Sequence, residues 1–591
     1  MLVRDGISAS PGIVIGPARV VGWDVPRVPH ETIEPSDIDR EIARFHAARD
    51  TARDELRTLM EQTARRLGPV EAQIFEPQIL MLDDVDLVDR TVEYIRENHL
   101  SAARAFTLRL LEFRSEWRGA GSPMVMDRLN DLLDVEIRIL RALLGLEHTE
   151  LIVTGEAHKS IIVARELTPS LTVQLDKDLV LGLAIDAGSR TSHSAIIARA
   201  LEIPAVVGLG DLSAQVQTGV EVILDGRDGR VIVAPTADQR ARYRERDIRV
   251  RDWEQELILL AHMEPVTPDH QPLTLRANID LPSEAESARD HGAQGIGLFR
   301  TEFLVVGRTA VPGEEEQYQA YRAVAELFSD QAVFIRTFDL GGDKFPRFLH
   351  LPPEENPFLG WRAIRVCLDM PDLFRTQLRA ALRATAHGDV RIMVPLITDV
   401  AEVTATREML EEEGEKLKAE GIPFNPGYKL GIMIETPAAA LTAHELARYV
   451  DFFSIGTNDL VQYSLAVDRG NAKLAPRFKT FHPAVLRQIR LTAQAARAAG
   501  VELSCCGEMA SHPLGVFMLM GMNITALSMG AASLPEVKKL VRSVPLSAAG
   551  AAVDEALKVD SAEAVQQILS DGIAPYIDLS LFGGRWSARG T

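Results

Sequence analysis

The sequence predicts an α/β multidomain protein whose C-terminal domain is a (β/α)8 barrel. The chain has 591 residues, several times the usual domain size of about 100–200 residues. Residues 25–145 repeat apolar side chains at helical spacing, whereas residues 146–235 carry short β-rich runs punctuated by glycine. From residue 266 onward, short apolar strands alternate with helical stretches, which is typical of βα units on a parallel sheet.

The N-terminal half divides into an α/β domain and a helical bundle inserted into it. Residues 1–24 are rich in glycine, proline and β-branched residues, and we expect them to complete the sheet of residues 146–235. Residues 25–145 are expected to form the bundle. A strongly charged stretch within residues 236–265 predicts a polar helix that links two domains.

The C-terminal half contains eight strand candidates, as a barrel requires. They are residues 273–278, 295–299, 333–337, 391–395, 431–434, 452–455, 501–504 and 526–528. The carboxyl ends of barrel strands lie on one face, where catalytic residues gather. The residues at or just past these ends include Arg300, Arg336, Asp339, Glu435, Asn458, Asp459 and Cys506.

Composition excludes several classes of protein. The 64 Lys and Arg against 84 Asp and Glu give a net charge of −20, which argues against nucleic acid as the main partner. Three cysteines without a C-x-x-C pair predict neither a disulfide framework nor structural zinc. The N-terminus lacks an apolar signal core, and residues 515–530 are too short to span a bilayer. We therefore expect a reduced, cytoplasmic protein without membrane insertion.

The predicted barrel face suits an anionic ligand held through a divalent cation. Carboxylates such as Glu435 and Asp459 are the hard oxygen ligands that Mg²⁺ prefers. Arginines supply paired donors for phosphate and carboxylate groups. The alternative, in which these carboxylates are only ion-paired at the bases of loops, is disfavoured because the charged residues occur together at strand ends.

His193 is a candidate phosphoryl acceptor in the N-terminal half. A lone histidine is more often a satisfied core or surface residue. Here Gly188 permits close backbone approach, Thr191 offers a hydroxyl, and an Ala/Ile-rich helix begins at His193 itself. A helix N-terminus presents free N–H groups and partial positive charge, which favour a phosphoryl group on the ring.

Several long motifs resemble one family. They are Gly-Ile-Gly-Leu-Phe-Arg-Thr-Glu-Phe-Leu (295–304), Ile-Arg-Thr-Phe-Asp-Leu-Gly-Gly-Asp-Lys (335–344), Glu-Glu-Asn-Pro-Phe-Leu-Gly-Trp-Arg-Ala-Ile-Arg (354–365), Gly-Ile-Met-Ile-Glu-Thr-Pro (431–437), Phe-Phe-Ser-Ile-Gly-Thr-Asn-Asp-Leu (452–460), Ala-Val-Asp-Arg-Gly-Asn (466–471) and Cys-Gly-Glu-Met-Ala (506–510). They are similar to the phosphoenolpyruvate-binding barrel of enzyme I, the phosphoenolpyruvate–protein phosphotransferase of the bacterial sugar phosphotransferase system. The resemblance extends over essentially the whole chain.

The resemblance implies that a phosphoryl group passes from phosphoenolpyruvate to His193 and then to a histidine of a small carrier of the HPr type, with release of pyruvate. Thr191 matches the hydrogen-bond partner of the phosphorylated histidine. Glu435 and Asp459 match the Mg²⁺ ligands. The residues that match substrate-binding positions are Arg300, Arg336, Lys344, Arg362, Asn458 and Arg469.

Cys506 matches the proton-transfer cysteine of the family. Departure of the phosphoryl group leaves the enolate of pyruvate, and a thiol can protonate its C3 carbon. Cys367 and Cys505 lie outside the matched positions and fit small buried apolar residues better.

The family also assigns the domains. Residues 1–24 and 146–235 match the phosphohistidine domain, 25–145 the carrier-binding subdomain, 236–265 the linker helix, and 266–591 the barrel, through which family members form homodimers.

Carrier docking is expected on an acidic and apolar segment of the helical insert. Its acidic residues are Glu71, Glu76, Asp83, Asp84 and Asp86. A solvated helix face is the commoner meaning of such a run. Pro77 is expected to disturb the helix in this segment, which bears on carrier specificity.

Two other functions share some of these sequence features. A pyruvate dikinase or phosphoenolpyruvate synthase shares the histidine loop and the barrel but also uses ATP. Such enzymes carry a large nucleotide-binding domain ahead of the histidine domain, where this chain has about 150 mostly helical residues without a Gly-rich loop. A phosphorylatable sensor is the third hypothesis, and the intact metal, arginine and thiol positions disfavour it.

Overall fold

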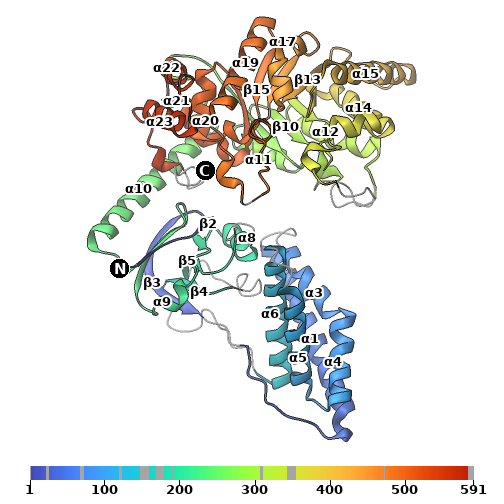
Figure 1. The fold of residues 1–591 in the computed structure, drawn as a ribbon, viewed down its shortest axis with the longest axis vertical. Coiled ribbons are helices and arrows are strands. Elements are labelled where there is room, and N and C mark those ends of the chain that lie inside the picture. The colour runs from blue at the N-terminus through green and yellow to red at the C-terminus, as the bar shows by residue number, and fades with distance from the viewer. Residues whose placement is uncertain are drawn as a thin grey trace. The chain divides into compact units, whose positions relative to one another are not determined.

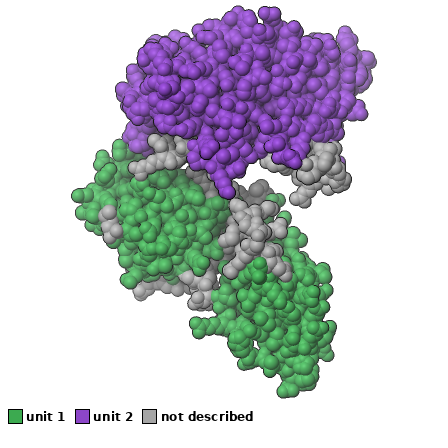
Figure 2. Space-filling model, in the orientation of Figure 1, with its two compact units in different colours: residues 1–251, 583–587 green, residues 252–582, 588–591 purple. Residues whose placement is uncertain are grey.

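The protein divides into two compact units (Figures 1 and 2). Unit 1 extends to Arg251, and unit 2 runs from Asp252 to Phe582. The computed structural model describes residues 2–21, 25–66, 72–118, 123–146, 159–167, 179–189, 192–305, 310–341, 354–471 and 473–582. The predicted fold class, α/β multidomain with a C-terminal barrel, is confirmed.

Unit 1 contains a mixed sheet in the order β1-β8-β7-β3-β4-β5-β6-β2. Its strands are β1 (Leu2–Asp5), β2 (Ile7–Ser10), β3 (Ile13–Val21), β4 (Ser160–Ala164), β5 (Val180–Ile185), β6 (Ala205–Val207), β7 (Glu221–Asp225) and β8 (Arg230–Val233). Strand β3 pairs in parallel with β4, so the first segment of the chain completes the later sheet, as expected. Two short helices, α8 (His193–Ala200) and α9 (Leu212–Gln215), belong to the same sheet region.

The helical part of unit 1 is a bundle of elongated helices (Figure 1). They are α1 (Ile38–Arg66), α3 (Glu76–Leu82), α4 (Val85–Asn98), α5 (Ala102–Arg118) and α6 (Pro123–Leu144). Helix α4 shows why the sequence folds this way: the Asp84 side chain accepts a hydrogen bond from the Leu87 amide at 2.9 Å and caps the helix. Its buried residues Leu87, Val88 and Ile95 then recur at helical spacing.

Pro77 does not disturb the helix, contrary to the sequence-based expectation. Helix α3 begins at Glu76, so Pro77 lies in its first turn. The first amides of a helix have no intrahelical acceptor, and proline loses no hydrogen bond there.

Helix α10 (Ala237–Leu260) contributes residues to both units, because the division falls at Arg251. Within unit 1, Arg246 pairs with the buried Asp225 at 2.6 Å and with Asp228 at 2.8 Å. Within unit 2, the Trp253 ring packs edge-on against Phe582 with ring centroids 5.3 Å apart. The helix is thus held in unit 1 by ion pairs, and in unit 2 by ring packing together with an ion pair between Glu256 and Lys539.

Unit 2 is a closed barrel of eight parallel strands in the order β10-β11-β12-β13-β14-β15-β16-β9. The strands are β9 (Thr274–Ile279), β10 (Ile296–Arg300), β11 (Val333–Arg336), β12 (Val390–Val394), β13 (Lys429–Ile434), β14 (Phe452–Ile455), β15 (Glu502–Cys505) and β16 (Ala526–Gly530). All eight coincide with predicted strands to within two residues at their ends.

Helices follow the barrel strands and continue past the last one. They are α11 (Glu284–Asp290), α12 (Glu314–Leu327), α13 (Ile364–Asp369), α14 (Pro371–Ala384), α15 (Val400–Glu420), α16 (Pro437–Leu441), α17 (Ala443–Leu446), α18 (Thr457–Leu465), α19 (Pro483–Ala499), α20 (Pro513–Gly521), α21 (Leu534–Ser543), α22 (Leu546–Ala556) and α23 (Ala562–Ile573). In the described part of the chain, no helix combines the length and apolar character needed to cross a membrane.

The barrel interior is filled with side chains. Phe334 packs edge-on against Phe452, with ring centroids 4.8 Å apart. The guanidinium groups of Arg276 and Arg391 lie 4.8 and 5.0 Å from the Phe334 ring centroid. Glu502 pairs with Arg391 at 2.5 Å and with Arg276 at 3.3 Å. This cluster occupies the amino-terminal half of the barrel, which leaves the carboxyl ends of the strands for the polar residues.

Candidate active site at the carboxyl ends of the barrel strands

The predicted strand-end residues lie around one cavity of about 280 Å³. Arg300 and Arg336 end β10 and β11, and Glu435 and Cys506 follow β13 and β15 directly. The cavity is lined by Leu298, Arg300, Phe303, Arg336, Asp339, Arg362, Met433, Glu435, Gly456, Asn458, Asp459, Arg469, Cys506, Gly507 and Glu508. Eight of the eleven predicted site residues line this cavity, and His193 lies in unit 1. The other two, Lys344 and Thr191, lie outside the described residues.

Arg336 is held in place by buried carboxylates. Its Nη2 donates to Glu302 Oε1 at 2.6 Å and lies 3.4 Å from Asp339 Oδ2. Burial favours the neutral guanidine, but the charges of Glu302 and Asp339 outweigh it and raise the pKa of Arg336. Arg336 therefore stays charged, with its guanidinium oriented at the cavity wall.

Arg362 joins two carboxylates of the cavity. Its Nε and Nη2 donate to the two oxygens of Asp339 at 2.7 and 2.8 Å, and Nη2 also donates to Asp459 Oδ2 at 2.9 Å. Nη1 donates to the Tyr463 hydroxyl oxygen at 3.0 Å. Such a fork of bonds fixes the plane of the guanidinium more firmly than a single contact would.

Glu435 and Asp459 are buried carboxylates on the same cavity. Glu435 Oε1 accepts a hydrogen bond from the Leu396 amide at 2.7 Å. A Cβ atom at Gly456 would clash with Glu435 Oε2, so only glycine leaves room for this carboxylate. Burial, together with the negative charges of Asp459 and Asp339, raises the pKa of Glu435 well above its usual range.

The donor set fits a divalent cation. Asp459 Oδ1 is buried and has no hydrogen-bond partner within the described residues, and Arg469 Nη2 lies 3.9 Å from it. Among the described residues no three His, Cys, Asp or Glu side chains are arranged to hold a metal by themselves. Mg²⁺ usually binds through one or two carboxylates and completes its shell with water and substrate oxygens, so two carboxylates suffice.

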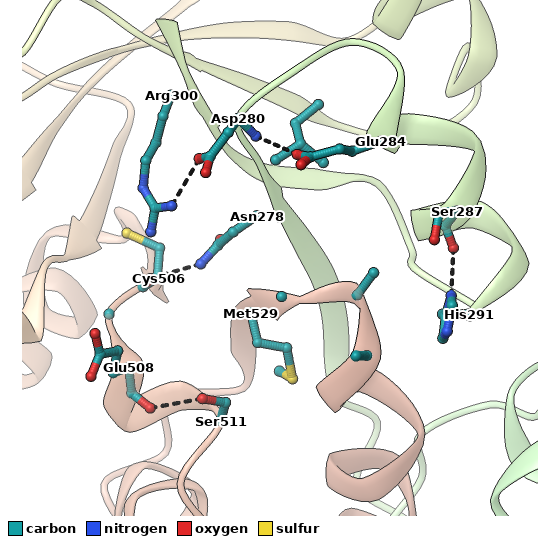
Figure 3. Close-up of a pocket in the computed structure, with 15 residues that line it drawn as sticks. Asn278, Asp280, Glu284, Ser287, His291, Arg300, Cys506, Glu508, Ser511 and Met529 are labelled. Atoms are coloured by element: carbon teal, nitrogen blue, oxygen red, sulfur yellow. Dashed lines mark hydrogen bonds and ion pairs between the residues drawn. The ribbon is translucent and has the colours of Figure 1, made fainter. Parts of the chain in front are cut away.

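Arg300 borders a second cavity of about 460 Å³, which shares Arg300, Cys506, Gly507 and Glu508 with the first. Figure 3 shows the Arg300 side chain extending toward Cys506, with Asp280 beside its guanidinium. Arg300 Nη1 pairs with Asp280 Oδ1 at 2.8 Å, and each side chain is about one-third exposed (34% and 33%). Asp280 therefore accepts a hydrogen bond from a guanidinium that is predicted to bind the substrate.

Asn458 and Arg469 complete the outer part of the cavity. Asn458 Nδ2 donates to Glu508 Oε1 at 3.2 Å, and its Oδ1 accepts from the Glu508 amide at 3.0 Å. Arg469 is exposed, and its backbone amide donates to Gln462 Oε1 at 3.1 Å. Their side chains lie at the solvent side of the buried network.

Cys506 is buried, with the barrel interior on one side and the arginines on the other. It belongs to a buried apolar cluster that also contains Leu298, Phe334 and Met433. Its sulfur accepts a hydrogen bond from Ser454 Oγ at 3.2 Å. Burial raises the pKa of the Cys506 thiol, against the lowering effect of the Ser454 hydrogen bond and of nearby arginines. The thiol is thus kept protonated next to the cavity.

His193 lies in unit 1 at the first position of helix α8, as the sequence predicts. Ser192 is the N-cap residue, and its hydroxyl donates to the Ser189 carbonyl at 2.9 Å. Gly188 has φ +107°, a conformation that L side chains rarely adopt. The first amides of an α-helix have no intrahelical acceptor, so the start of α8 places backbone donors next to His193.

The sequence did not reveal three residues that orient the site. Glu302 lies within the 295–304 motif and Asp339 lies at a predicted strand end, but the sequence assigns neither of them a role. Ser454 is a buried serine inside an apolar strand, with its sulfur partner 52 positions away. The contacts of these residues with Arg336, Arg362 and Cys506 join distant parts of the sequence, so they appear only in the folded barrel.

Comparison with known proteins gives matches along the chain. Three family models match: "PEP-utilising enzyme, N-terminal" at residues 5–128, "PEP-utilising enzyme, mobile domain" at 156–229, and "PEP-utilising enzyme, PEP-binding domain" at 254–546. The phosphoenolpyruvate-protein phosphotransferase of Geobacillus stearothermophilus is 40% identical over 560 residues, 95% of this chain and 96% of its own length. That of Haemophilus influenzae is 38% identical over 568 residues, 96% of this chain and 98% of its own length. A solution structure of an enzyme I protein, 35% identical, covers 42% of this chain and 99% of its own, with a TM-score of 0.34.

Proposed function

Because the chain belongs to the family of phosphoenolpyruvate–protein phosphotransferases, we propose that its barrel binds phosphoenolpyruvate and that His193 receives the phosphoryl group. Pyruvate is released, and the phosphoryl group passes from His193 to a histidine of a small carrier of the HPr type. The observation that carries this proposal is the cavity at the strand ends, which combines oriented arginines with a buried pair of carboxylates.

The carboxylates of the cavity offset most of its positive charge. Four arginines line it, and so do four carboxylates, of which Glu435 has a raised pKa that favours its neutral form. A divalent cation held by Glu435 and Asp459 would make the cavity more positive, and it would supply charge that favours a phosphate ester with a carboxylate.

The arginines bind and orient the substrate. Arg336 and Arg362 present guanidinium groups whose planes are set by Glu302 and Asp339 before substrate arrives. Preset donors lose little entropy on binding and need little rearrangement as charge shifts during transfer. Arg300, Arg469, Asn458 and Lys344 take further contacts to the phosphoryl and carboxylate groups.

His193 attacks phosphorus through a neutral ring nitrogen. The attack forms an N–P bond and breaks the P–O bond to the enol oxygen, so the transfer divides into two steps through a covalent phosphoenzyme. The free amides at the start of α8 and the hydroxyl of Thr191 stabilise the phosphoryl group on the ring.

Cys506 protonates the enolate that remains. Its buried thiol borders the cavity and keeps its proton until C3 of the enolate accepts it. This step completes the formation of pyruvate.

The carrier docks on the helical bundle, at a groove of about 490 Å³. Leu80, 71% exposed, lies in this groove with Met81 and Pro77. Several acidic residues predicted for docking also serve local structure: Asp84 caps α4, Asp83 pairs with Arg53 at 3.0 Å, and Asp86 pairs with Arg109 at 2.5 Å. Glu76 and Asp84 line the groove, and Glu71 lies outside the described residues. The proposed docking therefore combines apolar contact with these two carboxylates.

The domain roles follow the same proposal. Residues 1–24 and 146–235 act as the phosphohistidine domain, 25–145 as the carrier-binding subdomain, 236–265 as the linker, and 266–591 as the substrate-binding barrel. We further propose that the barrels pair in a homodimer and that the protein works in the cytoplasm.

Phosphoenolpyruvate labelled in its phosphoryl group tests the function. Purified protein with Mg²⁺ is expected to acquire acid-labile, alkali-stable label, and His193→Ala to acquire none. His387→Ala is the control, since its ring nitrogens face Tyr318 and Glu326 of unit 2. Label on His193→Ala, or label that requires ATP, would contradict the proposal, and the second result would favour the dikinase alternative.

A further inference from the structure

The hydroxyl of Ser454 is directed at the sulfur of Cys506 inside the barrel. Ser454 is the third residue of β14 and is fully buried. Alternate residues of a strand share a face, and Phe452, two positions earlier, packs in the barrel interior, so Ser454 also points inward. Its Oγ lies 3.2 Å from Cys506 Sγ and donates to it.

The thiol has a second polar neighbour on the same strand. Cys506 Sγ donates to the Ile455 carbonyl at 3.8 Å, and the Cys506 amide donates to the same carbonyl at 3.1 Å. Ser454 thus donates to a lone pair of the sulfur, while the S–H bond is directed at Ile455 and has to turn toward the cavity to reach the substrate. This arrangement orients the proton rather than competing for it.

We propose that Ser454 is a positioning residue that stabilises the Cys506 thiolate formed when the thiol protonates the enolate of pyruvate. This inference rests on the proposed function. In the step, the S–H bond breaks and its electron pair stays on sulfur. A C–H bond forms at C3 from the electron pair of the enolate, whose C2–O bond becomes the ketone carbonyl.

The hydrogen bond from Ser454 contributes more after proton transfer than before it. A neutral thiol is a weak acceptor, whereas an anionic acceptor forms bonds about twice as strong as a neutral one. An interaction that strengthens along the reaction lowers the barrier without tightening substrate binding. The hydrogen bond adds to the positive charges of Arg300 and Arg336, because the apolar cluster on the other side of Cys506 offers the thiolate no compensation.

Hydrogen exchange of pyruvate isolates this step from His193. Pyruvate and Mg²⁺ are incubated with the protein in D2O, and proton NMR follows the loss of the methyl signal. The signal falls because C3 loses a proton, which is the reverse of the protonation step, and then receives a deuteron in the forward direction. We expect Ser454→Ala to lower kcat of exchange about tenfold, as loss of one hydrogen bond to a charged group implies, with KM for pyruvate unchanged.

A matched pair of variants separates the hydroxyl from packing. Ser454→Thr keeps the hydroxyl and adds a methyl group. Ser454→Val carries a methyl group in place of the threonine hydroxyl and has nearly the same volume as threonine, so threonine should retain the rate and valine should lose it. Ser504→Ala is the control, because Ser504 pairs with Ser454 in register but donates to the Phe453 carbonyl at 3.3 Å. It should exchange like the wild type.

The outcomes distinguish this inference from the function on which it rests. If Cys506→Ala stops exchange while Ser454→Ala and Ser454→Val exchange at the wild-type rate, the inference is wrong. It is also wrong if threonine and valine slow exchange equally, or if KM rises in place of the fall in kcat. If Cys506→Ala exchanges normally, the thiol is not the acid and the inference is wrong as well. If the wild type takes no label from phosphoenolpyruvate, the proposed function itself fails.

Discussion

Replacing Asp280 with asparagine is expected to lower the KM for phosphoenolpyruvate while leaving kcat unchanged. Asp280 pairs with Arg300 at 2.8 Å, and Arg300 must release this carboxylate before it can bind the substrate. Asparagine keeps the size of the side chain but removes the competing charge. The substitution therefore removes a cost that the wild-type protein meets each time substrate binds.

The exposure of the pair sets the size of the effect. Both side chains are about one-third exposed (34% and 33%), so solvent screens their attraction, and such pairs are worth about 0.2–1 kcal/mol. Since about 1.4 kcal/mol corresponds to a tenfold change in an equilibrium constant, KM should fall by about 1.4-fold to fivefold. High salt should reduce the difference between variant and wild type.

Steady-state formation of pyruvate, with carrier protein in excess, gives both kinetic constants. Asp290→Asn is the matched control, because it removes one negative charge from the same region while its side chain is 72% exposed and 3.8 Å from Arg289. An unchanged or higher KM in Asp280→Asn would refute the competition argument. So would an equal fall in Asp290→Asn, which would indicate a general effect of net charge.

Three other predictions concern stability and the metal. Arg391 and Arg276 outweigh the effect of burial and hold the pKa of Glu502 below its usual range. The ionised carboxylate therefore contributes stability above about pH 4.3, and this contribution is lost as the pH falls through the lower pKa of the folded state. Glu502→Gln should lower the melting temperature at pH 7, and calorimetric scans should show a flatter decline of the melting temperature below about pH 4. Arg246→Met leaves Asp225 as an uncompensated buried charge and should reduce the unfolding free energy of unit 1 by about 3 kcal/mol in denaturant titrations followed by circular dichroism; an unchanged midpoint would show that backbone amides alone satisfy the carboxylate. Chelation of Mg²⁺ should stop labelling by phosphoenolpyruvate, and Glu435→Gln should raise the Mg²⁺ concentration for half-maximal labelling at least about tenfold, whereas labelling in the chelator would exclude the metal.

The barrel could be predicted because each of its strands carries its own signal. Strand β11 is an apolar run that ends at Arg336, and the same sequence of apolar run and polar end recurs around the barrel. For unit 1 the sequence indicated only β-rich runs within residues 146–235, and the short strands β6 and β8 were not assigned individually. The prediction that Pro77 disturbs the helix was wrong because the position of proline within a helix decides whether it is tolerated, and the sequence did not show that α3 begins at Glu76.

The residues that bind substrate could be predicted more readily than the residues that orient them. Arg336 and Arg362 could be assigned from motifs, but the carboxylates that orient them are contributed by other loops. Glu302 meets Arg336 because β10 and β11 are neighbours in the barrel, a relation that no local spacing records. Ser454 meets Cys506 for the same reason across β14 and β15.

Helix α10 is attached to each unit by contacts that dissolved salt weakens little. Arg246 pairs with the buried Asp225 in unit 1, and buried ion pairs are screened much less than exposed ones. Trp253 packs against Phe582 in unit 2, and salt does not weaken apolar packing. The pair of Lys539 with the partly exposed Glu256 is more open to screening, so high salt is expected to weaken that pair while leaving α10 attached to both units.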